Sequence, residues 1–286
     1  MIRHAPALVL PLAVTLLLAC PSQEPQPGGS GNYTKDLDED PDFSDPHGLI
    51  RVETWLDYGG NQLMGAFADG PRMRFHEESE RVGNCRLMTY TASPCDPPCE
   101  GETSCLGGEC VAWPSREDRG DLLWTWPDGE QTVSPDGNLA YFATGSASSE
   151  GEVSIEVDGL VLAASTIGPP LEVDSFVGDI TSRGSGDATL RWLDPVLDAR
   201  IRLHMSDCTG SHGGFAAAEI ECEGPDTGEL VVPGPFLDEL EAGDWSHGEC
   251  GSHTFERYHA STPDDEPLTR LETIGPGSLF YFPGME

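Results

Sequence analysis

The sequence Val153-Ser-Ile-Glu-Val-Asp-Gly-Leu-Val-Leu162 decides the fold class that we expect for this chain. Before Asp158-Gly159, apolar residues alternate with polar ones, and a period of two is typical of a β-strand with one buried face. An Asp-Gly pair between two such runs favours the two-residue turn of a β-hairpin. The stretch therefore predicts two antiparallel strands, Glu152–Val157 and Leu160–Ala164.

Similar short runs, separated by turn residues, recur from Gly48 onward. Their spacing of about 8–12 residues is typical of a sandwich or barrel, and helical periodicity is confined to Pro235–Ala242. The expected fold is mostly β, with antiparallel sheets in a β-sandwich-like arrangement and a small disulfide-knotted insertion. The other expected strands are Leu49–Leu56, Gln62–Ala68, Cys85–Thr91, Asp121–Trp126, Asn138–Ala143, Leu171–Phe176, Ala188–Leu193, Ala199–His204, Phe215–Cys222, Glu229–Val232, His253–His259 and Ser278–Phe282.

The charge balance is strongly acidic. The chain has 50 Asp and Glu residues against 15 Lys and Arg residues, which gives a formal net charge of −35. Such a charge disfavours nucleic acid and anionic lipid headgroups as partners, because both repel an acidic surface. It favours solubility, and it also suits binding of cations or basic surfaces.

The first 20 residues have the three parts of an export signal. Arg3 supplies a basic start, Ala5 to Leu18 are almost wholly apolar, and Ala19 is a small residue before Cys20. These features are typical of a secretory signal. The apolar run is shorter than the roughly 20 residues that a membrane-spanning helix needs.

The end of this segment, Leu17-Leu18-Ala19-Cys20, resembles the lipobox of bacterial lipoproteins. The resemblance implies cleavage after Ala19, a diacylglycerol on the Cys20 thiol and an acyl chain on the new N-terminus. Two or three acyl chains anchor a protein stably, whereas a single chain is marginal. Pro21 follows in place of the aspartate that commonly marks inner-membrane retention, so we expect the cell envelope and the outer membrane as the location.

Nine cysteines are present, and lipidation of Cys20 would leave an even number for disulfides in an oxidising compartment. Four of them lie close together, at 95, 99, 105 and 110, in a run rich in Pro and Gly. This run resembles the EGF-like or EB-type knots of exported proteins, and the resemblance implies the pairs Cys95–Cys105 and Cys99–Cys110. A zinc knuckle is the competing interpretation, because four thiolates can form a tetrahedral site. The eight disulfide candidates are Cys85, Cys95, Cys99, Cys105, Cys110, Cys208, Cys222 and Cys250.

The remaining four cysteines leave two pairings open. Cys208 and Cys222 end two apolar runs, so a bridge across a hairpin would join them and leave Cys85 with Cys250. The alternative joins Cys208 to Cys250 and Cys85 to Cys222. Spacing in the sequence does not decide between them.

Four segments are expected from these patterns. Residues 1–19 are a lipoprotein signal peptide, and residues 20–46 are an acidic, Pro- and Gly-rich tether with too few apolar residues to pack. Residues 47–115 are a small β region with the cysteine-rich knot at 95–110, and residues 116–286 are the β-sandwich-like domain. The second half also resembles uncharacterised cysteine-rich lipoproteins at Cys222, Asp226-Thr-Gly228 and Val231-Val-Pro233.

Motifs that could carry chemistry are weak. Asp226-Thr-Gly228 spells the aspartic-protease triplet, but that chemistry needs two such carboxylates and no second copy occurs. His247, Cys250, His253 and His259 could ligate a metal, although a polar loop with a disulfide explains them as well. No catalytic residue, metal site or cofactor is therefore predicted.

Three functions fit the whole sequence. The first is a lipid-anchored envelope protein with a non-enzymatic binding or structural role, whose partners are the membrane, through its lipid, and an unknown protein or glycan. The second is a surface hydrolase that acts on polysaccharide or peptide. The third is a calcium-stabilised adhesion module.

Overall fold

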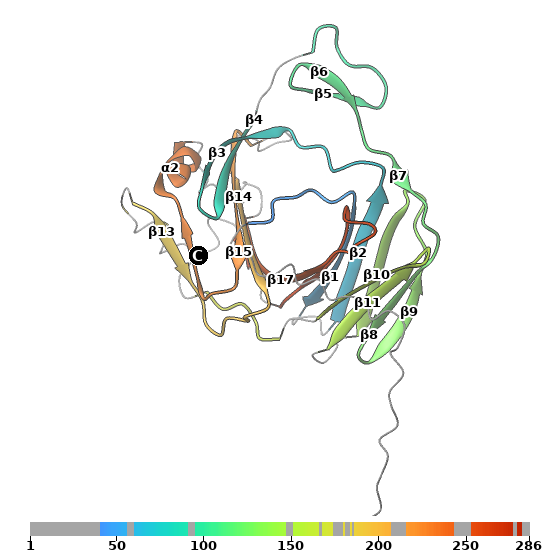
Figure 1. The fold of residues 1–286 in the computed structure, drawn as a ribbon. Coiled ribbons are helices and arrows are strands. Elements are labelled where there is room, and N and C mark those ends of the chain that lie inside the picture. The colour runs from blue at the N-terminus through green and yellow to red at the C-terminus, as the bar shows by residue number, and fades with distance from the viewer. Residues whose placement is uncertain are drawn as a thin grey trace, which may run out of the picture.

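An 11-stranded, mostly antiparallel sheet forms the centre of the molecule and curves strongly (Figure 1). Its main path runs β10-β2-β1-β18-β17-β14-β15-β4-β3, with β7 and β19 paired to β2 and β17. The computed structural model describes residues 41–55, 60–90, 95–146, 151–165, 168–173, 180, 184, 186–206, 216–242, 253–276 and 279–281. In these residues no helix is long and apolar enough to cross a membrane.

The strands of this sheet come from both ends of the chain. They are β1 (Gly48–Trp55), β2 (Gly60–Ala68), β3 (His76–Val82), β4 (Cys85–Tyr90), β7 (Arg116–Glu117), β10 (Ala140–Ser146), β14 (Arg200–Ser206), β15 (Ala218–Pro225), β17 (His253–Ser261), β18 (Thr269–Ile274) and β19 (Leu279–Tyr281). Smaller sheets consist of β8 (Leu122–Trp126), β9 (Gly129–Val133), β11 (Glu152–Val157) and β12 (Leu160–Ser165); of β13 (Ala188–Arg191) and β16 (Glu229–Val232); and of β5 (Thr103–Leu106) and β6 (Glu109–Ala112).

The mostly β architecture with antiparallel sheets is the one expected, and the hairpin at 152–165 is present as β11 and β12. Asp158 and Gly159 both have positive φ, at 50° and 79°. Positive φ at both central residues matches the type I′ turn that suits the twist of two antiparallel strands. The one described helix with bounds, α2 (Gly234–Ala242), lies where helical periodicity predicted it.

The expected division at residue 115/116 does not separate two sheets. β1 pairs in parallel with β18, and β4 pairs with β15, so strands from both expected regions share one sheet. Pairing between segments far apart in the sequence therefore joins the two expected regions in one sheet. Another expected strand, Leu171–Phe176, is reduced in its described part to a single bridge between Val173 and Trp192.

Two hydrophobic cores lie on the outer, convex side of the curved sheet. At one end, Phe236 and Leu240 of α2 pack with β13 and β16 against apolar residues of β14 and β15 such as Leu203. At the other end, the sheet of β8, β9, β11 and β12 packs Trp124 and Ile155 against β1, β2 and β10 of the large sheet. The elements that contribute these cores lie outside the curve of the large sheet (Figure 1), and alternation along its strands turns every second side chain to the concave side.

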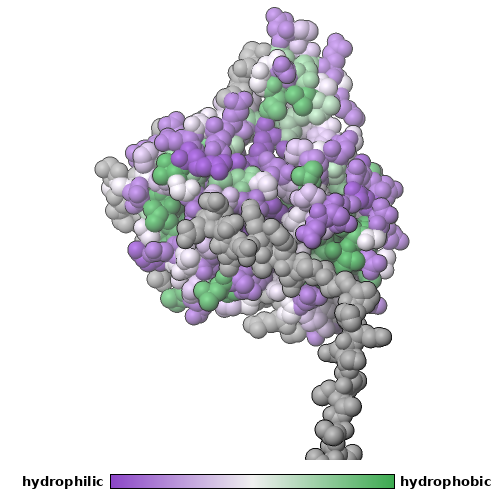
Figure 2. All heavy atoms as spheres, in the orientation of Figure 1, coloured by the Kyte–Doolittle hydropathy of each residue, from purple (hydrophilic) through white to green (hydrophobic). Residues whose placement is uncertain are grey.

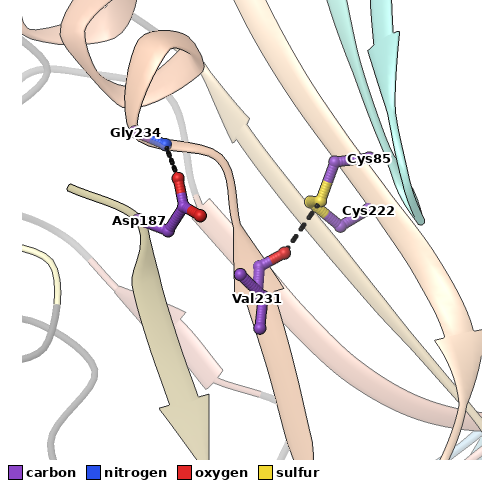
Figure 3. The surroundings of a disulfide bond; sticks show 5 residues. All are labelled: Cys85, Asp187, Cys222, Val231 and Gly234. Carbon is purple, nitrogen blue, oxygen red and sulfur yellow. Dashed lines mark hydrogen bonds between the residues drawn. A yellow bond between two sulfur atoms is a disulfide. The ribbon is translucent and has the colours of Figure 1, made fainter.

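The N-terminus of α2 is fixed by a residue from a different segment. The carboxylate of Asp187 accepts a hydrogen bond of 2.8 Å from the backbone N–H of Gly234 (Figure 3). An acidic acceptor at this position satisfies a free N–H group and suits the helix dipole. Glycine is required at 234, because a Cβ atom there would lie 2.5 Å from the carbonyl oxygen of Gly186.

Cys85 and Cys222 form a disulfide between the adjacent strands β4 and β15 (Figure 3). The hairpin bridge Cys208–Cys222 was therefore wrong. The carbonyl oxygen of Val231 lies 3.4 Å from the Cys85 sulfur, a close polar contact, since a disulfide sulfur has no proton to donate. Cys208 and Cys250 lie outside the described residues.

The cysteine-rich knot projects from the body of the molecule as the β5–β6 hairpin (Figure 1). Its disulfides join Cys95 to Cys105 and Cys99 to Cys110, the same pairs that the EGF-like or EB-type resemblance implies. Sulfur atoms in disulfides are not thiolate ligands, so a zinc knuckle at these positions is not supported. Figure 2 shows a mostly hydrophilic surface on the visible face, with hydrophobic side chains grouped on the knot.

Candidate functional site

The concave side of the large sheet, which we call the inner face, carries a dense set of opposite charges. Alternation along the strands places apolar residues such as Ile201 and Leu203 in the outer core and leaves Arg200 and Arg202 on the inner face. The other inner-face residues are Arg51, Arg86, His204, Glu219, Glu221, Glu223, Glu256, Tyr258, Arg270 and Glu272.

Glu272 on β18 is fully enclosed, with its side chain 1% exposed. Arg202 donates to it at 2.8 Å, and Arg51 and Arg270 approach it at 3.9 and 3.6 Å. Burial alone would raise the pKa of Glu272, but Arg202, then Arg51 and Arg270, lower it from 4.5 to about 2. The carboxylate is therefore ionised at neutral pH and serves as an acceptor.

Stability should depend on pH through this carboxylate. Its pKa is depressed in the folded chain, so its stabilising effect is complete above pH 4.5 and is lost as the pH falls towards 2. A shift of this size corresponds to about 3 kcal/mol. We expect the free energy of unfolding, measured by urea titration, to fall across this window. In Glu272→Gln the slope over the same window should be shallower, and an unchanged slope would contradict the assignment.

Glu223 on β15 occupies the centre of the inner face and is 1% exposed. It accepts hydrogen bonds from Arg200, from the Tyr258 hydroxyl at 2.6 Å, and from the backbone N–H of Asp42. The last of these donors does not belong to the sheet. It belongs to the segment that precedes β1.

Residues 41–47, which we call the docked segment, run across the inner face without forming a helix or strand (Figure 1). The Asp42 carboxylate pairs with Arg270 at 2.7 Å, and the Asp45 carboxylate pairs with Arg74 at 2.6 Å. The Phe43 ring lies under the Arg86 guanidinium, 4.3 Å from its centroid. Residues 41–46 were expected to be free tether, but in the structure their side chains satisfy arginines of the sheet.

His204 and Glu219 form a second group on the inner face, near the end of the β14–β15 pair. The His204 Nε2 atom lies 3.5 Å from one oxygen of Glu219, and the His76 Nε2 atom lies 3.7 Å from the other. Burial raises the pKa of Glu219, but the imidazoles of His204 and His76 lower it by a larger amount. The pKa of Glu219 therefore lies below its usual value. Glu221 lies beside them, paired with Arg74 and Arg86.

Three described carboxylates of this face, Glu219, Glu221 and Glu272, are poor candidates for acid catalysis. A glycosidase general acid needs a raised pKa. The pKa of Glu219, Glu221 and Glu272 is lowered instead, for Glu221 because Arg74 and Arg86 outweigh its burial. These residues can hold cations and hydrogen-bond donors, but they do not supply a proton at neutral pH.

Asp226 has a structural role. It is buried between Trp192, whose Nε1–H donates at 2.6 Å, and Arg257, whose Nε–H donates at 2.6 Å. The Arg257 side chain is fully buried and also donates to the carbonyl oxygens of Pro169 and Asp194, both at 3.0 Å. Asp226-Thr-Gly228 is thus part of a buried ion pair, not of a protease centre.

The other residues singled out from the sequence are scattered or not described. His253 and His259 lie at opposite ends of β17, roughly 20 Å apart at the rise of a strand, so they do not share a metal ion. Ala19, Cys20, His247 and Cys250 lie outside the described residues. In the described residues, no three carboxylates lie close enough together to suit a calcium ion.

Sequence reasoning missed the inner face, although its signal is present. Arg200-Ile-Arg-Leu-His204 and Glu219-Ile-Glu-Cys-Glu223 each alternate charged and apolar residues, with opposite signs of charge. Two strands of this kind are expected to pair, because opposite charges on facing positions attract. The structure pairs them as β14 and β15.

Comparisons with known proteins give little guidance. No known protein family matches the sequence, and no curated protein matches it. One similar solved structure is described as "Ca2+-stabilized adhesin helps an Antarctic bacterium reach out and bind ice", with 10% sequence identity and a TM-score of 0.20. The match covers 83% of this chain and 49% of that chain, so this chain spans about half of its length. A likeness at this level carries no argument.

Proposed function

We propose that this chain is a lipid-anchored protein of the bacterial cell envelope with a non-enzymatic binding role, and that the inner face is its binding surface. The lipobox-like Leu17–Cys20 supports the anchor. The docked segment is the observation that carries the binding role. The inner face already holds an extended acidic segment through ion pairs, one backbone hydrogen bond and an aromatic contact.

The chemistry of the inner face fits an acidic, aromatic partner. Six of the chain's 15 basic residues lie on this face or at its edge, in a molecule whose formal net charge is −35. Arginine suits carboxylates because its planar guanidinium donates several hydrogen bonds at fixed angles, and it also stacks on rings. The six residues are Arg51, Arg74, Arg86, Arg200, Arg202 and Arg270.

In this proposal the docked segment would connect the inner face to the lipid anchor. About 20 residues separate Cys20 from Asp42, and they are rich in Pro, Gly and acidic residues. In the proposed arrangement the lipid holds Cys20, this stretch is the spacer, and its end occupies the inner face. A partner segment of similar chemistry would displace residues 41–47, which lead into β1 and are held mainly through their side chains.

A labelled peptide of residues 41–47 tests this proposal. The variant Asp42→Asn/Asp45→Asn loses both ion pairs of the docked segment, and two such pairs contribute roughly 1 kcal/mol each. We expect the peptide to bind this variant about tenfold or more tightly than wild type, because its internal competitor is weaker. Fluorescence anisotropy measures the affinity.

The controls separate specific recognition from charge effects. Glu229→Gln removes an exposed carboxylate that pairs only loosely with Arg191, so it should bind the peptide as wild type does. A peptide with both aspartates replaced by asparagine should bind neither protein. If the variant binds neither peptide, or binds both equally, the inner face does not recognise an acidic segment and the proposal fails.

A further inference from the structure

A cluster of three side chains at the end of the β14–β15 pair points to a second function, separate from the binding of an acidic segment. The ligand-competent atoms of His204, Glu219 and Glu221 all lie within 4.8 Å of one another. These residues come from two paired strands, with His204 directly opposite Glu221 and Glu219 two positions along. The paired backbones therefore hold all three side chains on the same face of a rigid element.

The distances suit one shared ion. Zinc lies about 2.0–2.2 Å from imidazole nitrogen and carboxylate oxygen, so two ligands at a tetrahedral angle are roughly 3.4 Å apart. The His204 Nε2 to Glu219 oxygen distance is 3.5 Å. The His76 Nε2 atom lies 3.7 Å from the second Glu219 oxygen, but it donates a 2.7 Å hydrogen bond to the carbonyl oxygen of Ala216, so His76 borders the site and is not a ligand.

We propose that His204, Glu219 and Glu221 bind a divalent transition-metal ion, with His76 next to the site. One imidazole and two carboxylates are a mixed nitrogen and oxygen set, which suits Zn²⁺ and its neighbours better than Ca²⁺ or Mg²⁺. All three side chains are partly exposed, so an ion can enter and water can complete its coordination.

The arginines beside the site orient the Glu221 carboxylate and still leave it able to bind a metal. Arg74 donates to the Oε1 atom of Glu221 at 2.7 Å, and the Nε and Nη2 atoms of Arg86 both donate to Oε2. Each carboxylate oxygen has about two lone-pair positions, so Oε2 is fully used and Oε1 keeps one position for a metal. Hydrogen bonds to ligating carboxylates are usual around metal sites, where they fix the ligand's orientation. Asp45 of the docked segment offsets part of the Arg74 charge.

Titration of the full, membrane-extracted chain with ZnCl₂ tests the site. Isothermal calorimetry should show one saturable event in wild type, and bound zinc should raise the melting temperature, because a ligand of the folded state stabilises it. His204→Ala and Glu219→Gln should each weaken binding by tenfold or more. The controls are His259→Gln on β17 and Glu229→Gln on β16, which should bind zinc as wild type does.

Further results decide the proposal. Circular dichroism shows whether His204→Ala and Glu219→Gln remain folded. If either variant does not fold, the absorption spectrum of the wild type with bound Co²⁺ should show an imidazole ligand. A spectrum without an imidazole ligand overturns the proposal. Zinc binding that survives both substitutions in folded protein, or calcium binding as tight as zinc binding, also overturns it.

Discussion

Asp226→Asn is expected to lower the free energy of unfolding by 3–5 kcal/mol, the usual cost of leaving a buried charge without its partner. The substitution removes the carboxylate that faces Arg257, whose side chain is fully buried. It also weakens the acceptor of the Trp192 and Val196 N–H groups. At roughly 2–4 °C per kcal/mol, the melting temperature should fall by about 10 °C.

The matched control is an ion pair at the surface of the neighbouring β13–β16 sheet. Arg191 and Glu229 approach to 3.8 Å, but their side chains are 61% and 59% exposed. Exposed pairs of this kind contribute about 0–1 kcal/mol, so Glu229→Gln should change the melting temperature little. Equal melting temperatures for Asp226→Asn and Glu229→Gln would show that the Asp226–Arg257 pair does not stabilise the fold.

Removal of the Cys85–Cys222 disulfide is the second large effect. The bridge spans 137 residues, and in the chain-entropy account a loop of this length stabilises the folded state by about 5 kcal/mol. Both cysteines are fully buried in the core that contains Trp192 and Phe255. In Cys85→Ala/Cys222→Ala we therefore expect a large loss of stability, measured by urea unfolding with tryptophan fluorescence.

The knot provides the comparison for this disulfide. Cys95–Cys105 spans only 10 residues, which corresponds to about 3 kcal/mol in the same account. Its effect should also be local, because the β5–β6 hairpin pairs with no other strand among the described residues. Cys95→Ala/Cys105→Ala should leave the urea midpoint of the body close to wild type, and an equal loss in both double variants would contradict this ranking.

Short-range patterns predicted the individual strands well. The alternation at 152–162 and the Asp158-Gly159 turn gave β11 and β12, because turn chemistry and face alternation act within a few residues. The same logic did not predict β3, β5, β6, β7, β9 or β18. β3 is almost wholly polar and exposed, and β18 carries Arg270 and Glu272, whose charges obscured a strand that is buried along its whole length.

Long-range pairing could not be predicted from the sequence. The parallel match of β1 with β18 joins residues more than 200 positions apart, and nothing local specifies it. The inner face depends on this long-range pairing, because Arg270 can pair with Asp42 only when β18 lies beside β1. The choice between Cys222 and Cys250 as the partner of Cys85 also depended on long-range pairing, because β4 and β15 are far apart in the sequence and become neighbours only in the folded sheet.

Intact mass spectrometry of the membrane-extracted protein, with and without reduction, tests the lipid anchor most directly. We predict a chain that begins at Cys20 and carries diacylglyceryl and acyl groups. Reduction should add two hydrogens for each of the three disulfides seen here, and two more if Cys208 pairs with Cys250. A mature chain without lipid, or a Cys20→Ala variant that remains bound to membranes, would contradict the account.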